Sequence, residues 1–145
     1  MRPSIDETLM AEAWLWSRRG TCSRRRVGAV VATSQGVTIS HGYNGALSGM
    51  PHCAPHDDHQ PCDISEHAER NAFYFAARRG VSVEGCTLYS TDSPCVACAR
   101  AAVQTGIVRV VYDRPYRDDQ GLVLLLAAGL KVDRITTGGI KEERQ

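Results

Sequence analysis

The N-terminal part of the chain carries apolar side chains at helical spacing. These positions are Ile5, Leu9, Ala13 and Trp16. Ser4, with Glu7 three residues later, matches a capping box, and Gly20 stops the pattern. We therefore expect a helix over residues 4–19.

Short apolar runs and helical patterns then alternate along the chain. The expected strands cover 26–33, 37–41, 86–90, 107–112 and 131–135, and the expected helices cover 67–79, 95–105 and 118–128. The first two strands flank Gly36 and should pair as an antiparallel hairpin. Alternation of strands and helices in the second half predicts an α/β protein, with helices on both faces of a mixed sheet.

Residues 44–65 break this alternation. The segment is rich in Gly, Pro, His, Asp and Cys and has few large apolar side chains. Structureless loops of this length are uncommon in compact domains and tend to be functional or tied down by metal. We find no repeat or linker, so we expect a single domain over 1–145 with a flexible tail over 136–145.

Composition and charge restrict the function classes. The 145 residues are 43% hydrophobic, and 17 Lys and Arg face 16 Asp and Glu for a net charge of +1. This near-neutral balance makes nucleic acid an unlikely partner. The longest apolar run, 122–130, is far shorter than the about 20 residues that span a bilayer, and the N-terminus lacks the apolar core of a signal peptide.

These features predict a protein of the cytoplasm, in a bacterium or a phage-infected host cell, with no membrane partner. Thiols stay reduced there, so metal binding or catalysis is a better hypothesis for the six cysteines than disulfides.

Two short motifs carry the candidate chemistry. His67-Ala68-Glu69 and Pro94-Cys95-Val96-Ala97-Cys98 each open an expected helix. Helix N-termini favour thiolates, and three N and S ligands leave zinc one open position for water. Zinc lowers the pKa of that water toward neutrality, and Glu69 would move its protons. His-x-Glu followed by Pro-Cys-x-x-Cys is typical of zinc-dependent base deaminases.

Two other interpretations of these motifs are weaker. Cys95 and Cys98 alone would fit a redox pair, but this ignores His67 and Glu69. A closed structural zinc site would need a fourth ligand and would have no use for the acid.

The chain resembles the deoxycytidylate (dCMP) deaminase family over most of its length. The segments that carry the resemblance are Cys22, 26–30, 42–45 (Gly-Tyr-Asn-Gly), 67–72, 88–99, 111–112 and Tyr116. The Gly-Tyr-Asn-Gly segment and Asn71 favour this branch over tRNA adenosine deaminases and free cytidine deaminases.

The resemblance implies a cytidine deaminase-like fold, a three-layer α/β/α sandwich around a five-stranded sheet. It also implies hydrolysis of dCMP, a small-molecule nucleotide, to dUMP and ammonia. Several family members are hexamers that dCTP activates and dTTP inhibits. We therefore expect a homo-oligomer, either a hexamer or a dimer, with dCTP and dTTP as candidate effectors.

The resemblance also assigns substrate contacts. It places Asn44 at the sugar or base, the Ala68 backbone at the base, and Arg26 and Tyr116 near the phosphate, with Ser93 also at the substrate. Alternatives stay open: Asn44 as a turn residue before Gly45, Arg26 on a solvated strand edge, and Tyr116 as a cover of the core.

Two further sites follow from the resemblance. The first is an effector site at Gly42, Tyr43 and Arg78, although Arg78 also suits a helix C-terminus. The second is a structural zinc, for which the candidate ligands are Cys22, Cys53, Cys62 and His59, with His56 as the alternative to His59. Solvated histidines and inert thiols are the competing interpretation. Cys86 begins a buried strand and is expected in the core.

Ser90 and Leu47 depart from the family pattern, in a region expected to face the substrate. They leave open a modified cytosine nucleotide, such as a 5-substituted dCMP. Two other hypotheses are a deaminase of a base in a polynucleotide and a catalytically silent, zinc-stabilised nucleotide sensor. Glu69 argues against the sensor, because binding alone does not need that acid.

Overall fold

The computed structural model describes residues 2–22, 25–52 and 64–137, and its core is a mixed five-stranded sheet. The strands of this sheet are β1 (Gly28–Ala32), β2 (Thr38–Tyr43), β5 (Thr87–Asp92), β6 (Arg109–Arg114) and β7 (Lys131–Arg134). They are ordered β2-β1-β5-β6-β7; β1 runs antiparallel to both neighbours, and β5, β6 and β7 are parallel. The predicted hairpin and mixed sheet are therefore confirmed.

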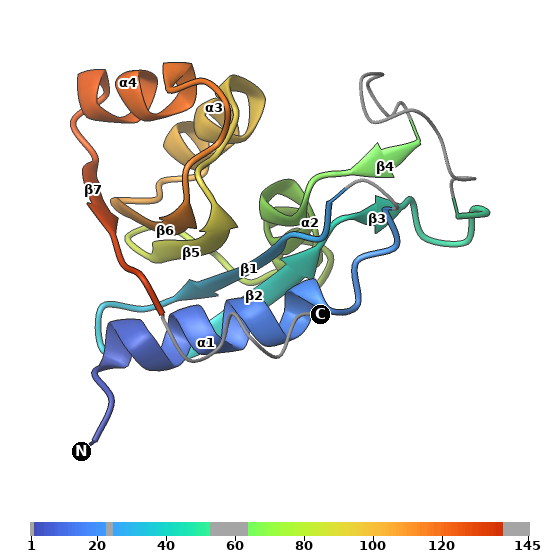
Figure 1. Ribbon diagram of the computed structural model, residues 1–145, viewed down its shortest axis with the longest axis horizontal. Coiled ribbons are helices and arrows are strands. Elements are labelled where there is room, and N and C mark those ends of the chain that lie inside the picture. Colours follow the sequence, from blue (N-terminus) through green and yellow to red (C-terminus); the bar gives the residue numbers. More distant parts are fainter. Residues whose placement is uncertain (1, 23–24, 53–63, 138–145) are drawn as a thin grey trace.

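Helices cover both faces of the sheet (Figure 1). They are α1 (Ile5–Ser17), α2 (Ala68–Arg78), α3 (Val96–Gln104) and α4 (Gln120–Ala127). Strand β1 shows the two layers, because Ala29 and Val31 pack on the side of α2 and α3, while Val30 and Ala32 pack against α1. The three-layer α/β/α sandwich is confirmed, and Cys86 lies in the core as expected.

Helix α1 begins as its sequence predicts. The Ser4 hydroxyl accepts a hydrogen bond from the Glu7 backbone N–H at 3.1 Å, and the Glu7 carboxylate accepts one from the Ser4 N–H at 2.7 Å. Farther along, the Trp14 indole donates to the buried Asp113 carboxylate on β6 at 2.8 Å, which fixes α1 against the sheet.

The ends of the expected loop over 44–65 are more ordered than predicted. Two short strands, β3 (Gly45–Ala46) and β4 (Ser65–Glu66), pair antiparallel. Because β4 directly precedes His67, this pairing sets where the His67 motif enters α2. The segment 53–63 and the C-terminal residues 138–145 lie outside the described residues.

Within the described ranges, no helix combines the length and the apolar character needed to cross a membrane.

Candidate metal centre

The two sequence motifs meet where helices α2 and α3 begin. His67 is the N-cap of α2, Cys95 is the N-cap of α3, and Cys98 lies in the first turn of α3. Neither side chain forms a capping hydrogen bond, so both are available to the cluster. The His67 Nδ1 atom lies 3.5 Å from the Cys95 sulfur and 3.4 Å from the Cys98 sulfur. One ligand atom of each residue lies within 4.8 Å of the others.

A close backbone approach fixes the segment that carries Cys95. A Cβ atom at Gly121, in α4, would overlap the Pro94 carbonyl oxygen and lie 3.0 Å from the carbonyl carbon of Cys95. Only glycine lets α4 pack this tightly on the turn between β5 and α3.

The donor set fits zinc. With zinc bonds of about 2.0 Å to nitrogen and 2.3 Å to sulfur, tetrahedral ligands lie about 3.5 Å apart, close to the spacing found here. Hydrogen bonds from Cys98 and then from His67 lower the pKa of the Cys95 thiol to about 3. Cys95 therefore supplies the thiolate that metal binding needs.

Glu69 is held beside this cluster, in the first turn of α2. Its side chain is buried, with 4% of the residue exposed. Burial raises the pKa of the Glu69 carboxyl to about 7, while the nearby charge of His67 acts in the opposite direction. A carboxyl group that changes protonation near neutral pH is suited to general acid–base catalysis.

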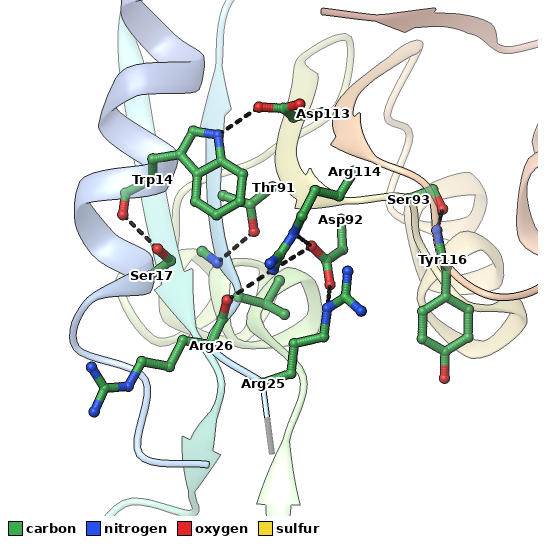
Figure 2. A network of polar contacts seen from close by, with 12 residues as sticks. Trp14, Ser17, Arg25, Arg26, Thr91, Asp92, Ser93, Asp113, Arg114 and Tyr116 are labelled. Atoms are coloured by element: carbon green, nitrogen blue, oxygen red, sulfur yellow. Dashed lines mark hydrogen bonds and ion pairs between the residues drawn. The ribbon is translucent and has the colours of Figure 1, made fainter. Parts of the chain in front are cut away.

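A cavity of about 400 Å³ opens on Glu69 and the cluster. Most substrate residues expected from the sequence line it: Asn44, Ala68, Ser93 and Tyr116. Arg26 does not, whereas its neighbour Arg25 and also Arg117 do. Figure 2 shows that the Arg26 side chain points away from Tyr116, while that of Arg25 points toward the same side as Tyr116. Within the arginine run at 24–26, a candidate for phosphate binding in the sequence, Arg26 was singled out instead of Arg25, and Arg117 was not anticipated.

Asn44 does more than fill a turn. Its side-chain oxygen accepts from the Val27 N–H at 2.8 Å, and its amide donates to the Arg25 carbonyl at 2.6 Å. It thus fixes the backbone that carries Arg25 while it also lines the cavity.

A second cavity of about 330 Å³ lies next to the same segment. Tyr43 and Gly45 line it, whereas Asn44 between them lines the first cavity, which is the alternation of an extended chain. Of the expected effector residues, Tyr43 and Arg78 line this cavity and Gly42 does not. A Cβ atom at Gly42 would overlap the Ala68 carbonyl oxygen and lie 2.6 Å from the Ala72 nitrogen, so Gly42 serves a close strand–helix contact.

Stacked side chains extend from this second cavity along α1 and β2. The Trp16 ring stacks on His41 at 3.6 Å and on Tyr43 at 6.2 Å between centroids. The Arg19 guanidinium lies 5.5 Å from the centre of the Tyr43 ring and lines the cavity. In the sequence, the pair Arg18-Arg19 was a candidate for phosphate binding, but nothing in the local pattern separates Arg19 from a solvated helix end.

The structure also gives the positions of Ser90, Leu47 and Cys22. Ser90 is fully buried and does not line the cavity of Glu69, and Leu47 lines the second cavity instead. Neither residue therefore supports room for a modified base. Cys22 is buried and lines the first cavity. The other candidate ligands of a second zinc, Cys53, His56, His59 and Cys62, lie outside the described residues, so that site stays a prediction.

Comparison with known proteins decides the family. Residues 3–114 match the model of the cytidine and deoxycytidylate deaminase zinc-binding region. The chain belongs to this family. The match spans both zinc motifs, so the fold and the zinc cofactor expected from the sequence are confirmed by the family and the donor set.

Individual relatives agree with this assignment. The chain is 38% identical to deoxycytidylate deaminase of Saccharomyces cerevisiae over 91% of its own length and 45% of that protein. It is 34% identical to ComE operon protein 2 of Bacillus subtilis, over 92% of this chain and 72% of that one. A crystal structure of dCMP deaminase from the cyanophage S-TIM5, in complex with dCMP and dUMP, superposes with a TM-score of 0.85 at 34% identity, covering 93% of this chain and 99% of the other.

Proposed function

We propose that this protein is a zinc-dependent deaminase that hydrolyses dCMP to dUMP and ammonia. The observation that carries the proposal is the buried carboxyl of Glu69 beside His67, Cys95 and Cys98, in a cavity lined by two arginines. Family membership and the deoxycytidylate deaminases among its relatives support the same reaction.

The chain divides the chemistry between a metal and an acid. His67, Cys95 and Cys98 would hold zinc, which when bound supplies a water molecule of near-neutral pKa as the nucleophile. Glu69 would take one proton from this water and give it to N3 of the cytosine ring. It would then take the second proton, from the hydroxyl group formed on C4, and give it to the amino group, which leaves as ammonia. The raised pKa of Glu69 suits it to both directions of transfer.

The remaining residues of the cavity would orient the nucleotide. The Ala68 backbone would contact the base and Asn44 the sugar or base. Arg25 and Arg117, rather than Arg26, would receive the phosphate, with Tyr116 beside them. The Ser93 hydroxyl oxygen already accepts from the Tyr116 N–H at 2.5 Å, which leaves its hydrogen for a ligand.

Ammonia release from a panel of substrates tests the function. The zinc-loaded protein is assayed with dCMP, CMP, deoxycytidine, dCTP, 5-methyl-dCMP and a cytosine oligonucleotide. We expect selective turnover of dCMP. Preference for 5-methyl-dCMP or the oligonucleotide would replace the substrate, and nucleotide binding without ammonia release from any compound would favour the sensor hypothesis.

The acid is tested with Glu69→Gln, for which Glu84→Gln on the exposed surface is the matched control. Loss of the acid should lower kcat by about 10²–10⁴-fold with zinc content unchanged. Retained turnover would exclude Glu69 as the proton carrier.

We propose the second cavity as the effector site. Arg19 and Arg78 supply positive charge and Tyr43 supplies an aromatic face, as binding of dCTP or dTTP requires. Assembly as a homo-oligomer, a cytoplasmic location and a structural zinc that includes Cys22 remain predictions from the sequence.

A further inference from the structure

We infer that Asp92 is a positioning residue that holds Arg25 at the cavity, where the free end of the Arg25 guanidinium binds the phosphate of a nucleoside monophosphate. The inference rests on the proposed function and adds a determinant of substrate class to the same site.

Asp92 binds two arginines with one carboxylate. It ends strand β5, and its side chain is 6% exposed. One carboxylate oxygen lies 2.5 Å from the Arg25 Nε atom. The other oxygen lies 2.8 Å from both the Nε and the Nη2 atoms of Arg114, its register neighbour on β6 (Figure 2).

Arg114 makes two further contacts that fix its guanidinium. Its guanidinium lies 4.8 Å from the centre of the Trp14 ring, and its Nη2 atom donates to the Arg26 carbonyl at 3.3 Å. The contacts of Arg114 therefore hold the Asp92 carboxylate in one orientation, and Asp92 presents its second oxygen toward Arg25.

Arg25 has a different arrangement. Its side chain is 43% exposed and lines the cavity. The Nε atom is engaged by Asp92, and among the described residues no protein group pairs with the two terminal nitrogens. A guanidinium held through Nε presents both terminal nitrogens together, which is the geometry that binds phosphate oxygens in pairs.

The local charge favours an anion at this place. One carboxylate faces the guanidinium groups of Arg25 and Arg114, and Arg117 lines the same cavity, with its guanidinium 5.7 Å from the centre of the Tyr116 ring. Positive charge therefore exceeds negative charge here. The base end of the cavity is defined by Glu69 and the metal donors, so the phosphate binds where the arginines lie.

Comparing the binding of dUMP with that of deoxyuridine separates a role in phosphate binding from a general effect on the cavity. Calorimetry on the zinc-loaded protein compares the wild type with Asp92→Asn, Arg25→Ala and Arg26→Ala. Arg26 is the comparison residue, since it also precedes strand β1 but its side chain points away from Tyr116. We expect Asp92→Asn to weaken dUMP binding about tenfold, because it removes the ion pair that orients Arg25. Arg25→Ala should weaken binding at least as much, because it removes the charge-assisted contact to the phosphate itself.

We expect three further results if Asp92 acts through Arg25 on the phosphate. Deoxyuridine binding and zinc content should stay within about twofold in every variant, since the uridine lacks the phosphate that these contacts serve. Arg26→Ala should bind dUMP as the wild type does. Combining Asp92→Asn with Arg25→Ala should cost no more than Arg25→Ala alone, because both changes remove one interaction.

Arg25→Lys keeps the test decisive if Asp92→Asn fails to fold. Lysine retains the charge but cannot pair through Nε while presenting two further donors, so dUMP should bind about fivefold more weakly. Wild-type affinity in Arg25→Lys, equal losses for dUMP and deoxyuridine, or a phosphate-specific loss in Arg26→Ala would each overturn the inference. So would a wild type that binds dUMP no better than deoxyuridine. Absent turnover of dCMP with retained phosphate-selective binding would contradict the proposed function alone.

Discussion

The two cavities of this protein are neighbours built in different ways. The first contains the candidate metal donors and the acid, with His67 and Cys95 as helix N-caps and Glu69 in the first turn of α2. The second is formed by the later turns of α2, the end of β2 and the turn after β3, and it includes side chains with exposed surface, such as Tyr74 and Leu47. The difference indicates that the groups of the first cavity must keep one fixed geometry. The exposed side chains that line the second cavity can be replaced without disrupting the hydrophobic core.

The largest expected effect comes from breaking the first cavity at a metal donor. Cys98→Ser should lose zinc and reduce turnover below detection, because serine does not replace a thiolate ligand of zinc. Metal content and ammonia release measure the outcome. Cys86→Ser is the matched control, since Cys86 is also buried but lies outside the cluster. Full zinc content in Cys98→Ser would remove Cys98 from the ligand set.

Removing zinc with a chelator should have the same effect on turnover without a mutation. Zinc, when added back, should restore ammonia release, because the three donors would hold the group that supplies the nucleophile. Turnover that persists in metal-free protein would contradict this account of the first cavity.

The next effect concerns the backbone contact beside both cavities. Gly42→Ala should lower the free energy of unfolding by about 1–3 kcal/mol, because the new methyl group overlaps the backbone of α2. Gly49→Ala, where a Cβ meets no atom within 4 Å but φ is +81°, should cost about 1 kcal/mol from backbone strain alone. Chemical denaturation compares them. Equal losses would show that β2 and α2 have room to separate.

A smaller effect is expected in the second cavity. Arg78→Ala should weaken binding of dCTP or dTTP about tenfold, because a charge-assisted contact to phosphate is lost. Arg79→Ala, at the adjacent position outside the cavity lining, is the control. Calorimetry on both variants decides, and an equal loss in Arg79→Ala would point to a general charge effect.

The smallest expected effect is the pH dependence of the stack beside the second cavity. Burial, together with the charge of Arg79, lowers the pKa of His41 against the opposing effect of Glu12. The folded state therefore disfavours the protonated ring. His41 contributes stability above the ordinary pKa of about 6.5 and loses it as pH falls through the lowered value. His41→Gln should show a smaller fall in Tm between pH 7.5 and pH 5. Parallel Tm curves would exclude this contribution.

Sequence reasoning anticipated the parts of the molecule that have strong local signals. Gly20, Gly36, Gly80, Gly106 and Gly129 separate the elements, and their predicted ends agree with the structure to within a few residues. The donors of the first cavity were predictable because a metal motif constrains both residue type and spacing. The β3–β4 pair was missed, since strands of two residues have no alternation to detect.

The side-chain direction of individual arginines was beyond the sequence. Arg25 and Arg26 are consecutive, so in an extended segment only one of them faces the cavity, and nothing local fixes which. Ser90 was misplaced for a similar reason. Its strand is buried on both faces, so the alternation that would reveal its orientation is absent. The second cavity is composed of segments that are distant in sequence. The family resemblance had already placed Tyr43 and Arg78 in one site, whereas Arg19 and Leu47 were connected to them only by the fold.

Helix α2 is a shared partition between the two cavities. Its first turn gives Ala68 and Glu69 to one, and its later turns give Tyr74 and Arg78 to the other. Because Gly42 has no side chain, strand β2 lies directly against the backbone of α2. The Asn71 amide of α2 also donates a hydrogen bond to the Tyr43 carbonyl at 2.9 Å. Helix α2 is therefore closely packed against β2. A ligand that displaces α2 in one cavity would also change the shape of the other cavity.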